Sequence, residues 1–529
     1  MDHFWGRQQE DGERAVANNR SEQKVRIALV TVMALVSQAV CWQAVHADQP
    51  VRPNIIFILA DDLGYGDVRC FNPQGQIETP HVDRIAREGM RFVDAHSGSS
   101  VCSPTRYGIM TGRYSWRGKL KAGVLGGLSP RLIEPGRSTV ASMLQSHGYR
   151  TACIGKWHLG MDWEILPGKK ISELSIETPG QVANVDYAKP IRNGPNTVGF
   201  DYYFGISASL DMVPYTFIEN DHVVEVPSRT TEYPMVMGGK AGKTRTGPAA
   251  AGFDAANVLP TLTEKAVGFI QKQAADAREG RPFFLYVPLA SPHTPVLPVE
   301  PWQGRSGLNA YADFVMATDA AVGAILAALD AHQLTDNTLV IFTSDNGCSP
   351  LADFETLRAK RHDSSAGFRG AKADIYEGGH RVPFVARWPG KVQAGSTSEQ
   401  LVFLGDFYAT CAEVIGHVPP RDAAEDSFSF LPAMTGQSTA ASRQSIVHHS
   451  SNGSFAIREG SWKLCLCPDS GGWSDPKPGR VPANAPQVQL FELATDRAEK
   501  TNLAATHAQK VSELRERLEA IQKAGRSAP

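Results

Sequence analysis

The sequence lacks the charge surplus of a nucleic-acid-binding protein. Its 529 residues carry 53 Lys and Arg against 55 Asp and Glu, which gives a formal net charge of −2. Domains that bind nucleic acids usually have a basic surplus, so we expect no nucleic-acid partner. An anionic substrate stays possible, because a local pocket can be strongly charged in a chain that is nearly neutral overall.

Internal repeats and low-complexity tracts are missing as well, and cysteine is scarce, with 8 in the chain. Cys41 lies in the N-terminal leader, and Cys102 has a special context. The other six show neither the spacing of a metal site nor a CxxC redox motif; they are Cys70, Cys153, Cys348, Cys411, Cys465 and Cys467.

Long apolar runs are absent after the N-terminus. Near it, basic residues precede an apolar run from Ile27 to Val40, and the small-residue pattern Val45-His46-Ala47 follows. The run is shorter than the roughly 20 residues of a membrane-spanning helix. The pattern predicts a signal peptide over residues 1–47, with a weak anchor or a disordered leader as alternatives. We therefore expect an exported, periplasmic or extracellular protein without a stable membrane span.

Apolar strands alternate with helices through most of the remaining chain. We expect strands at 54–60, 149–154, 282–289 and 338–343, and helices at 80–89, 139–146, 259–274 and 311–332. Strands that are apolar throughout indicate a mostly parallel sheet covered by helices on both faces, which is the α/β class. The polar stretch 161–246 is expected to form long surface loops with short elements.

The alternation of apolar strands and helices ends at about Gly436. Short strands at 454–458, 462–467 and 488–493 precede a helix at about 504–524. They predict a small C-terminal subdomain, an antiparallel sheet with one packed helix. The expected organisation is a leader (1–47), a main domain (48–436) and the subdomain (437–529).

Polar side chains follow four of the expected strands. In chain order they are Asp61 and Asp62, Lys156 and His158, His293, and Asp345 and Asn346. Any one of these is more often a turn signal or a structural histidine than a site residue. Ligands of open parallel sheets bind beyond the carboxyl ends of the strands. Polar side chains after four strands at this same edge therefore favour a binding or catalytic site.

The residue types indicate its chemistry. Four oxygen donors suit a hard cation, calcium or magnesium, better than zinc, and calcium tolerates an irregular cage better than magnesium does. Arg106, Lys156, Lys372 and the two imidazoles add positive charge. A metal with several cationic side chains suits a tetrahedral oxyanion, either sulfate or phosphate.

Cys102 is the candidate nucleophile. Pro104 closely follows it and indicates the first turn of a helix, where an anion is favoured. From the residues alone, a reactive thiolate and a buried structural cysteine are both possible.

The segment Cys102-Ser103-Pro104-Thr105-Arg106, followed by Thr111-Gly112-Arg113, resembles the signature of type I, formylglycine-dependent sulfatases. The resemblance covers nearly all of the chain after the leader. Further matching blocks are 53–67, 155–160, 291–293, 344–347, 368–372, 376–383 and 490–503. One departure is Arg497, where the family usually has proline, and we expect it to affect a surface turn. Several blocks look closest to the arylsulfatase A and N-acetylgalactosamine-6-sulfatase branch.

The resemblance implies an alkaline-phosphatase-like fold and a mechanism. A separate formylglycine-generating enzyme, a transient partner, oxidises the cysteine to an aldehyde. After hydration, one hydroxyl attacks sulfur and the other later expels sulfate.

The resemblance also implies roles for individual residues. One Ca²⁺ is held by Asp61, Asp62, Asp345, Asn346 and residue 102. Arg106 and Lys156 anchor the diol, and His158 assists proton transfer there. His293 and Lys372 contact sulfate, and one of the two protonates the leaving oxygen.

The implied substrate is a sulfated carbohydrate or an aryl sulfate, with a galactose or N-acetylgalactosamine 6-sulfate favoured. Aromatic candidates for sugar stacking are Tyr202, Tyr203, Tyr215, His362, Trp462 and Trp473, although ordinary packing is the commoner role of such residues. The rival functions are a phosphate or phosphonate ester hydrolase of the same superfold and a non-catalytic carbohydrate-binding relative.

Overall fold

The computed structural model describes residues 52–239, 241–437 and 443–528. These residues belong to one compact unit, Arg52–Pro529. The leader predicted for residues 1–47 lies outside the described residues. The signal peptide and the exported location therefore stay predictions.

The centre of the main sheet is parallel. Strand β1 (Asn54–Ala60) lies between β10 (Phe283–Pro288) and β11 (Thr338–Ser344), and β4 (Arg150–Lys156) and β5 (Tyr202–Ile206) continue on the β10 side. The four strands predicted from apolar runs are all present. Their carboxyl ends meet at one edge of the sheet.

Further strands, most of them paired antiparallel, extend this centre on both sides to a ten-stranded mixed sheet. On the β11 side β12 (Phe384–Arg387) and β2 (Met90–Phe92) are antiparallel, and β13 (Ser396–Ser398) pairs with β2. On the other side lie β6 (Ile218–Glu219) and β7 (His222–Val223).

The stretch 161–246 was expected to form long loops with short elements, and β5, β6 and β7 are the short elements of this stretch that join the main sheet. Strand β5 is short and contains Gly205, whose missing side chain allows a very close approach to β4. A Cβ atom at this position would lie 1.7 Å from the carbonyl oxygen of Gly155. Glycine in a strand marks such close backbone approaches, which is why the strand has a weak sequence signal.

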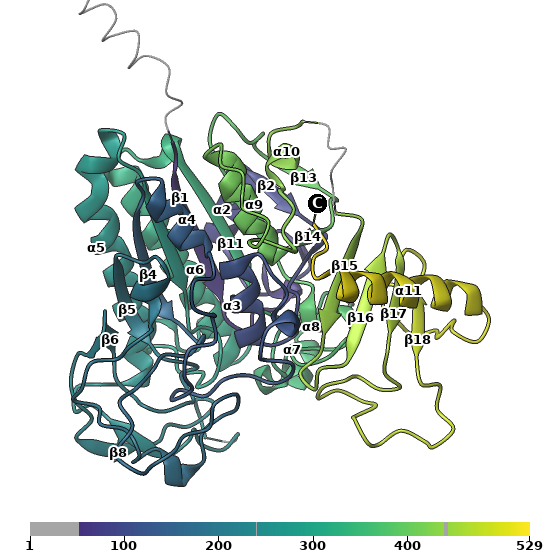
Figure 1. Ribbon diagram of the computed structural model, residues 1–529, viewed down its shortest axis with the longest axis horizontal. Coiled ribbons are helices and arrows are strands. Elements are labelled where there is room, and N and C mark those ends of the chain that lie inside the picture. Colours follow the sequence, from purple (N-terminus) through teal and green to yellow (C-terminus); the bar gives the residue numbers. More distant parts are fainter. Residues whose placement is uncertain (1–51, 240, 438–442, 529) are drawn as a thin grey trace, which may run out of the picture. The chain divides into compact units, whose positions relative to one another are not determined.

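Helices cover both faces of the sheet (Figure 1). The core on one face includes residues of α2 (Pro80–Glu88), α5 (Val258–Arg278) and α6 (Ala310–Ala331). The core on the other face includes residues of α3 (Cys102–Thr111), α4 (Val140–Ser146) and α9 (Phe407–Val414). Within the described residues, α6 alone is long and apolar enough to cross a membrane, but 78% of its apolar window is buried in the protein.

The C-terminal residues form a second, antiparallel sheet. Its order is β15 (Ser445–His449), β16 (Phe455–Glu459), β17 (Trp462–Cys465) and β18 (Gln489–Glu492). Leu514, Leu518 and Ile521 of α11 (Ala508–Ala524) share its hydrophobic core. The sheet and helix confirm the predicted architecture, with β15 as an additional strand. The domain boundary near residue 436 stays a prediction.

Short elements complete the described chain. Strand β3 (Ala95–His96) pairs with β14 (Val402–Phe403), and β8 (Arg229–Thr231) pairs with β9 (Gly247–Ala249). The short helices are α7 (Phe354–Ala359), α8 (Glu377–His380) and α10 (Leu431–Met434).

Candidate active site

Four oxygen-bearing side chains lie together where β1 and β11 end. Asp61 and Asp62 follow β1, Asp345 and Asn346 follow β11, and none is more than 1% exposed. The amide of Asp62 donates to Oδ1 of Asp345 at 3.3 Å, and Nδ2 of Asn346 donates to Oδ1 of Asp62 at 2.8 Å. The pairing of the two strands thus gathers acids that are 284 positions apart in the sequence.

The backbone is unusual at two positions of this edge. Asp62 has a φ of 63° and His158 a φ of 55°, in the left-handed region that non-glycine residues seldom adopt. Asp62 directly follows Asp61, and the change in backbone direction turns both side chains toward the same region. Strained backbone of this kind is concentrated at functional sites.

The donor set fits a hard divalent cation. One donor atom from each of Asp61, Asp62, Cys102 and His293 lies within 4.8 Å of the others. Oδ1 of Asn346 is buried and has no hydrogen-bond partner among the described residues. A buried oxygen without a partner is costly unless something compensates it, and carboxylate and amide oxygens are the ligands that calcium prefers.

Electrostatics points to the same conclusion. Burial, followed by repulsion from Asp61, raises the pKa of Asp345 to about 7. Burial alone would raise the pKa of Asp61 too, but attraction to Lys156, His293 and Arg106 holds it well below its usual value. A divalent cation among these carboxylates relieves their mutual repulsion.

Three basic side chains surround the acids. Arg106 of α3 donates to Oδ2 of Asp345 through Nε at 3.1 Å and Nη2 at 2.8 Å. Nζ of Lys156 donates to Asp61, and Nζ of Lys372 lies 2.7 Å from Asp62. The three contacts assign one cation to each carboxylate, so the buried charges are paired.

Cys102 is the first residue of α3, as its proline spacing predicted. Its Sγ lies 3.6 Å from Oδ1 of Asp61, and the residue is 2% exposed. Burial raises the pKa of its thiol to about 12, although Lys156 and Lys372 lower it in part. Without a metal ion beside it, the group is therefore a protonated thiol at neutral pH.

The two imidazoles differ in their hydrogen bonds. Nε2 of His158 lies 2.8 Å from the carbonyl oxygen of Leu125, while its Nδ1 is buried without a partner in the described chain. Burial, with the charge of Lys156, holds the pKa of His158 well below its usual value, so this ring is neutral. Nδ1 of His293 donates to the carbonyl oxygen of Thr294 at 2.6 Å, and its Nε2 lies 3.7 Å from Asp62.

Solvent reaches the cluster on one side. The side chains of His293 and Lys372 are 8% and 7% exposed, whereas those of Asp61, Arg106 and Lys156 are fully buried. His293 and Lys372 are therefore the basic residues on the solvent side of the cluster. All predicted site residues are gathered in this region, but their individual roles stay predictions.

Sequence reasoning missed two residues that position the site. Oγ of Ser209 accepts from Nζ of Lys156 at 2.7 Å, and it lies in the stretch that was expected to be loops. The carboxylate of Asp374 accepts from the amide of Ala371 at 2.9 Å and so holds the turn that carries Lys372. Asp374 lies between the matching blocks 368–372 and 376–383, and this position was the available signal.

Most of the aromatic candidates do not face the site. Tyr203, Tyr215 and His362 are at most 1% exposed, so they cannot stack on a sugar. The His362 ring lies 2.8 Å from Asp67. Tyr202 begins β5, at the opposite edge of the sheet, and Trp462 packs against the C-terminal core. Trp473 alone among the six lies near a predicted site residue, with its ring centroid 5.9 Å from Nζ of Lys372.

A second group of buried side chains comes from β3, α8 and β15. It contains the imidazoles of His96, His380 and His448. Nζ of Lys463 lies 3.0 Å from His380, and Nη1 of Arg458 lies 3.1 Å from His96. Cations so close to the ring nitrogens oppose a metal ion, so this cluster is a poorer metal site than the acidic one.

Arg497 lies exposed in a turn, as expected, and it also contacts an aromatic ring. Its guanidinium lies 3.9 Å from the ring centroid of Phe368 and lines a cavity with Arg381 and Tyr65. It thus connects the C-terminal residues to the block that carries Lys372.

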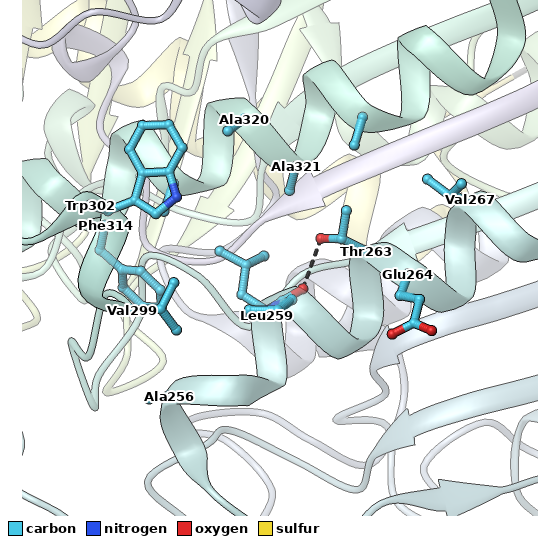
Figure 2. A pocket seen from close by; sticks show the side chains of 13 residues that line it. Ala256, Leu259, Thr263, Glu264, Val267, Val299, Trp302, Phe314, Ala320 and Ala321 are labelled. Atoms are coloured by element: carbon cyan, nitrogen blue, oxygen red, sulfur yellow. Dashed lines mark hydrogen bonds between the residues drawn. The ribbon is translucent and has the colours of Figure 1, made fainter. Parts of the chain in front are cut away.

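An apolar groove between α5 and α6 is separate from the acidic cluster. Figure 2 shows Leu259, Val267, Trp302 and Phe314 among its lining side chains. Its volume is about 430 Å³, and none of the predicted site residues lines it.

Comparison with known proteins identifies similar sequences over most of the chain. The family model described as Sulfatase matches residues 53–417. An N-acetylgalactosamine-6-O-sulfatase of Bacteroides thetaiotaomicron is 33% identical, over 91% of this chain and 96% of its own length. Arylsulfatase A of Homo sapiens is 32% identical, over 89% of this chain and 87% of its own length.

Solved structures with a similar fold are also known. One, from a study of the metabolism of multiple glycosaminoglycans by Bacteroides thetaiotaomicron, has a TM-score of 0.76 and 32% identity, and the match covers 90% of this chain and 100% of that one.

Proposed function

This chain belongs to the sulfatase family and is a sulfuric ester hydrolase, and we propose that it removes sulfate from sulfated carbohydrates with a formylglycine made from Cys102 beside one Ca²⁺. The observation that carries the proposal is the placement of Cys102. It begins a helix and lies 3.6 Å from Asp61, in the only described cluster that combines carboxylates, an amide oxygen and a cysteine in this way.

The fit of the donor set supports the metal. Asp61, Asp62, Asp345 and Asn346, with residue 102, would hold Ca²⁺, and the bound ion would polarise a sulfate oxygen. Formylglycine would supply a hydrated aldehyde with two hydroxyls on one carbon.

The residues of the chain have distinct tasks in this proposal. Arg106 fixes Asp345 and Lys156 fixes Asp61, so the carboxylates keep their positions while charge develops. Neutral His158 has a buried, unpartnered Nδ1 that can take a proton from residue 102. His293 and Lys372 lie on the solvent side, where sulfate enters, and either can protonate the leaving oxygen.

The relatives support a sulfated sugar as the substrate. The bacterial relative is named for N-acetylgalactosamine 6-O-sulfate, and the similar solved structure comes from work on glycosaminoglycans. We propose a galactose or N-acetylgalactosamine 6-sulfate of a glycosaminoglycan, handled after export to the periplasm or the exterior.

Peptide mass spectrometry tests the nucleophile. The tryptic peptide that contains residue 102 should be lighter than the encoded one, by the difference between a CH₂SH and a CHO group. The same preparation should release inorganic sulfate from N-acetylgalactosamine 6-sulfate. Full turnover by a preparation whose peptide is entirely unmodified would refute the formylglycine.

A phosphonate or phosphate ester hydrolase is the second candidate, because the cation cluster also suits phosphate. Parallel assays with a sulfate ester and a phosphonate ester of the same alcohol separate the two. We expect the sulfate ester to be preferred.

A further inference from the structure

A tryptophan from the C-terminal residues lies at the accessible side of the site. The ring centroid of Trp473 is 5.9 Å from Nζ of Lys372, and that ammonium is 2.7 Å from Asp62. Trp473 is also 48% exposed, which is unusual for so large an apolar side chain. The ring therefore lies beside one of the two basic residues on the solvent side of the cluster.

The segment that carries Trp473 is held rigidly by one carboxylate. Oδ1 of Asp374 accepts from the amides of Trp473 at 2.8 Å and Ser474 at 3.0 Å. Its Oδ2 accepts from the amide of Ala371 at 2.9 Å. Asp374 is fully buried, so a single anchor fixes both the Lys372 turn and the Trp473 turn.

Close backbone packing adds to this anchor. A Cβ atom on Gly472 would lie 2.4 Å from the backbone of Ala373. The amide of Ala373 donates to the carbonyl oxygen of Ser100 at 2.8 Å, and that of Ile375 donates to Ser470 at 2.7 Å. The indole ring is thus positioned, through backbone contacts, relative to the segment that begins at Ser100 and contains Cys102.

From this geometry we propose that Trp473 is a specificity-determining residue that stacks on the sugar ring whose sulfate ester is cleaved. The inference rests on the proposed function. A rigid aromatic face binds the C–H face of a sugar at van der Waals distance, about 3.5–4 Å, with little loss of side-chain entropy. In this arrangement a sulfate on the exocyclic carbon would lie near Lys372, whose Nζ is over the same ring, 5.9 Å from its centroid.

Stacking selects the sugar and does not perform chemistry. It acts equally in the bound substrate and in the transition state, so its loss should raise KM and leave kcat nearly unchanged. The contact does not involve the sulfate group, so inorganic sulfate should bind as before.

The test compares wild type with Trp473→Ala, Trp473→Phe and Trp473→Leu in the full chain. Trp302→Ala is the matched control, since Trp302 lines the apolar groove between α5 and α6. Two quantities are measured: the kinetics of sulfate release from N-acetylgalactosamine 6-sulfate, and the inhibition constant of inorganic sulfate.

We expect kcat/KM to fall about tenfold in Trp473→Ala and Trp473→Leu, mainly through KM, with the sulfate inhibition constant within twofold of wild type. Trp473→Phe should retain most of the activity, and Trp302→Ala all of it. Equal kcat/KM in wild type and Trp473→Ala would overturn the inference, and so would a parallel loss of sulfate inhibition. Absence of turnover in wild type would instead contradict the proposed function.

Discussion

Removing the divalent cation should lower the thermal stability of this sulfatase as well as its activity. Asp61, Asp62 and Asp345 are packed together at no more than 1% exposure, and their repulsion helps raise the pKa of Asp345 to about 7. A cation that binds the folded chain alone stabilises it by mass action. At a free concentration of 100 times Kd this contribution is about 2.7 kcal/mol.

The size of the protein sets the expected shift in Tm. Unfolding entropy is about 2.1 cal/mol/K per residue, so the roughly 470 described residues give about 1 kcal/mol/K. A stabilisation of about 2.7 kcal/mol then corresponds to a rise of about 3 °C. The shift is small because the unfolding entropy of a large chain is large.

Differential scanning fluorimetry measures this shift. Protein stripped with a chelator is titrated with CaCl₂, and with MgCl₂ in parallel. Wild type should show the full rise with calcium, and Asn346→Ala should show little of it, because the variant loses the unpartnered Oδ1. Asp221→Asn is the matched control, since its carboxylate is 61% exposed. An undiminished calcium shift in Asn346→Ala and in Asp62→Asn would refute the metal assignment.

Three further results are expected. Cys102→Ala should abolish sulfate release while circular dichroism stays unchanged, and appreciable turnover would contradict its role as nucleophile. Lys463→Met should lower the free energy of unfolding by about 3–5 kcal/mol in chemical denaturation. The fully buried Nζ of Lys463 lies 3.1 Å from Glu377 and 2.8 Å from Glu499, and both carboxylates would lose this cation. The control variant Lys510→Met, at an exposed position, should have almost no effect. The free energy of unfolding should also fall as the pH drops below about 6.5, the usual pKa of histidine. Burial lowers the folded-state pKa of the imidazoles of His96, His380 and His448, so only the unfolded chain gains their protons. A dependence of stability on pH that is unchanged in His448→Gln would argue against this explanation.

The parallel centre of the fold could be predicted because its strands are apolar throughout. Strands β1, β4, β10 and β11 are buried on both faces, which leaves a clear signal in the sequence. Strand β5 was missed because it is short and depends on Gly205 to fit beside β4. Strand β15 was missed because it is also short and two of its five residues are histidines, which weakens the apolar pattern.

The acidic cluster was predictable for a similar reason, because neighbouring parallel strands bring their carboxyl ends together. The roles of the aromatic residues could not be predicted from the sequence. Tyr203 and Tyr215 donate their hydroxyls to backbone carbonyls inside the protein, which no local pattern reveals. Trp473 lies near Lys372 because of long-range contacts of its turn, among them the hydrogen bond to Asp374, 99 positions earlier.

The depth of Cys102 has a consequence for how the enzyme comes into being. At 2% exposure, and enclosed by Asp61 and the first turn of α3, this side chain is out of reach of another protein's active centre once the chain has folded. If Cys102 is converted to formylglycine as proposed, the converting enzyme must therefore act on the chain before this segment has folded. Under that proposal, the fraction of active enzyme produced in a host would depend on whether oxidation of Cys102 precedes folding.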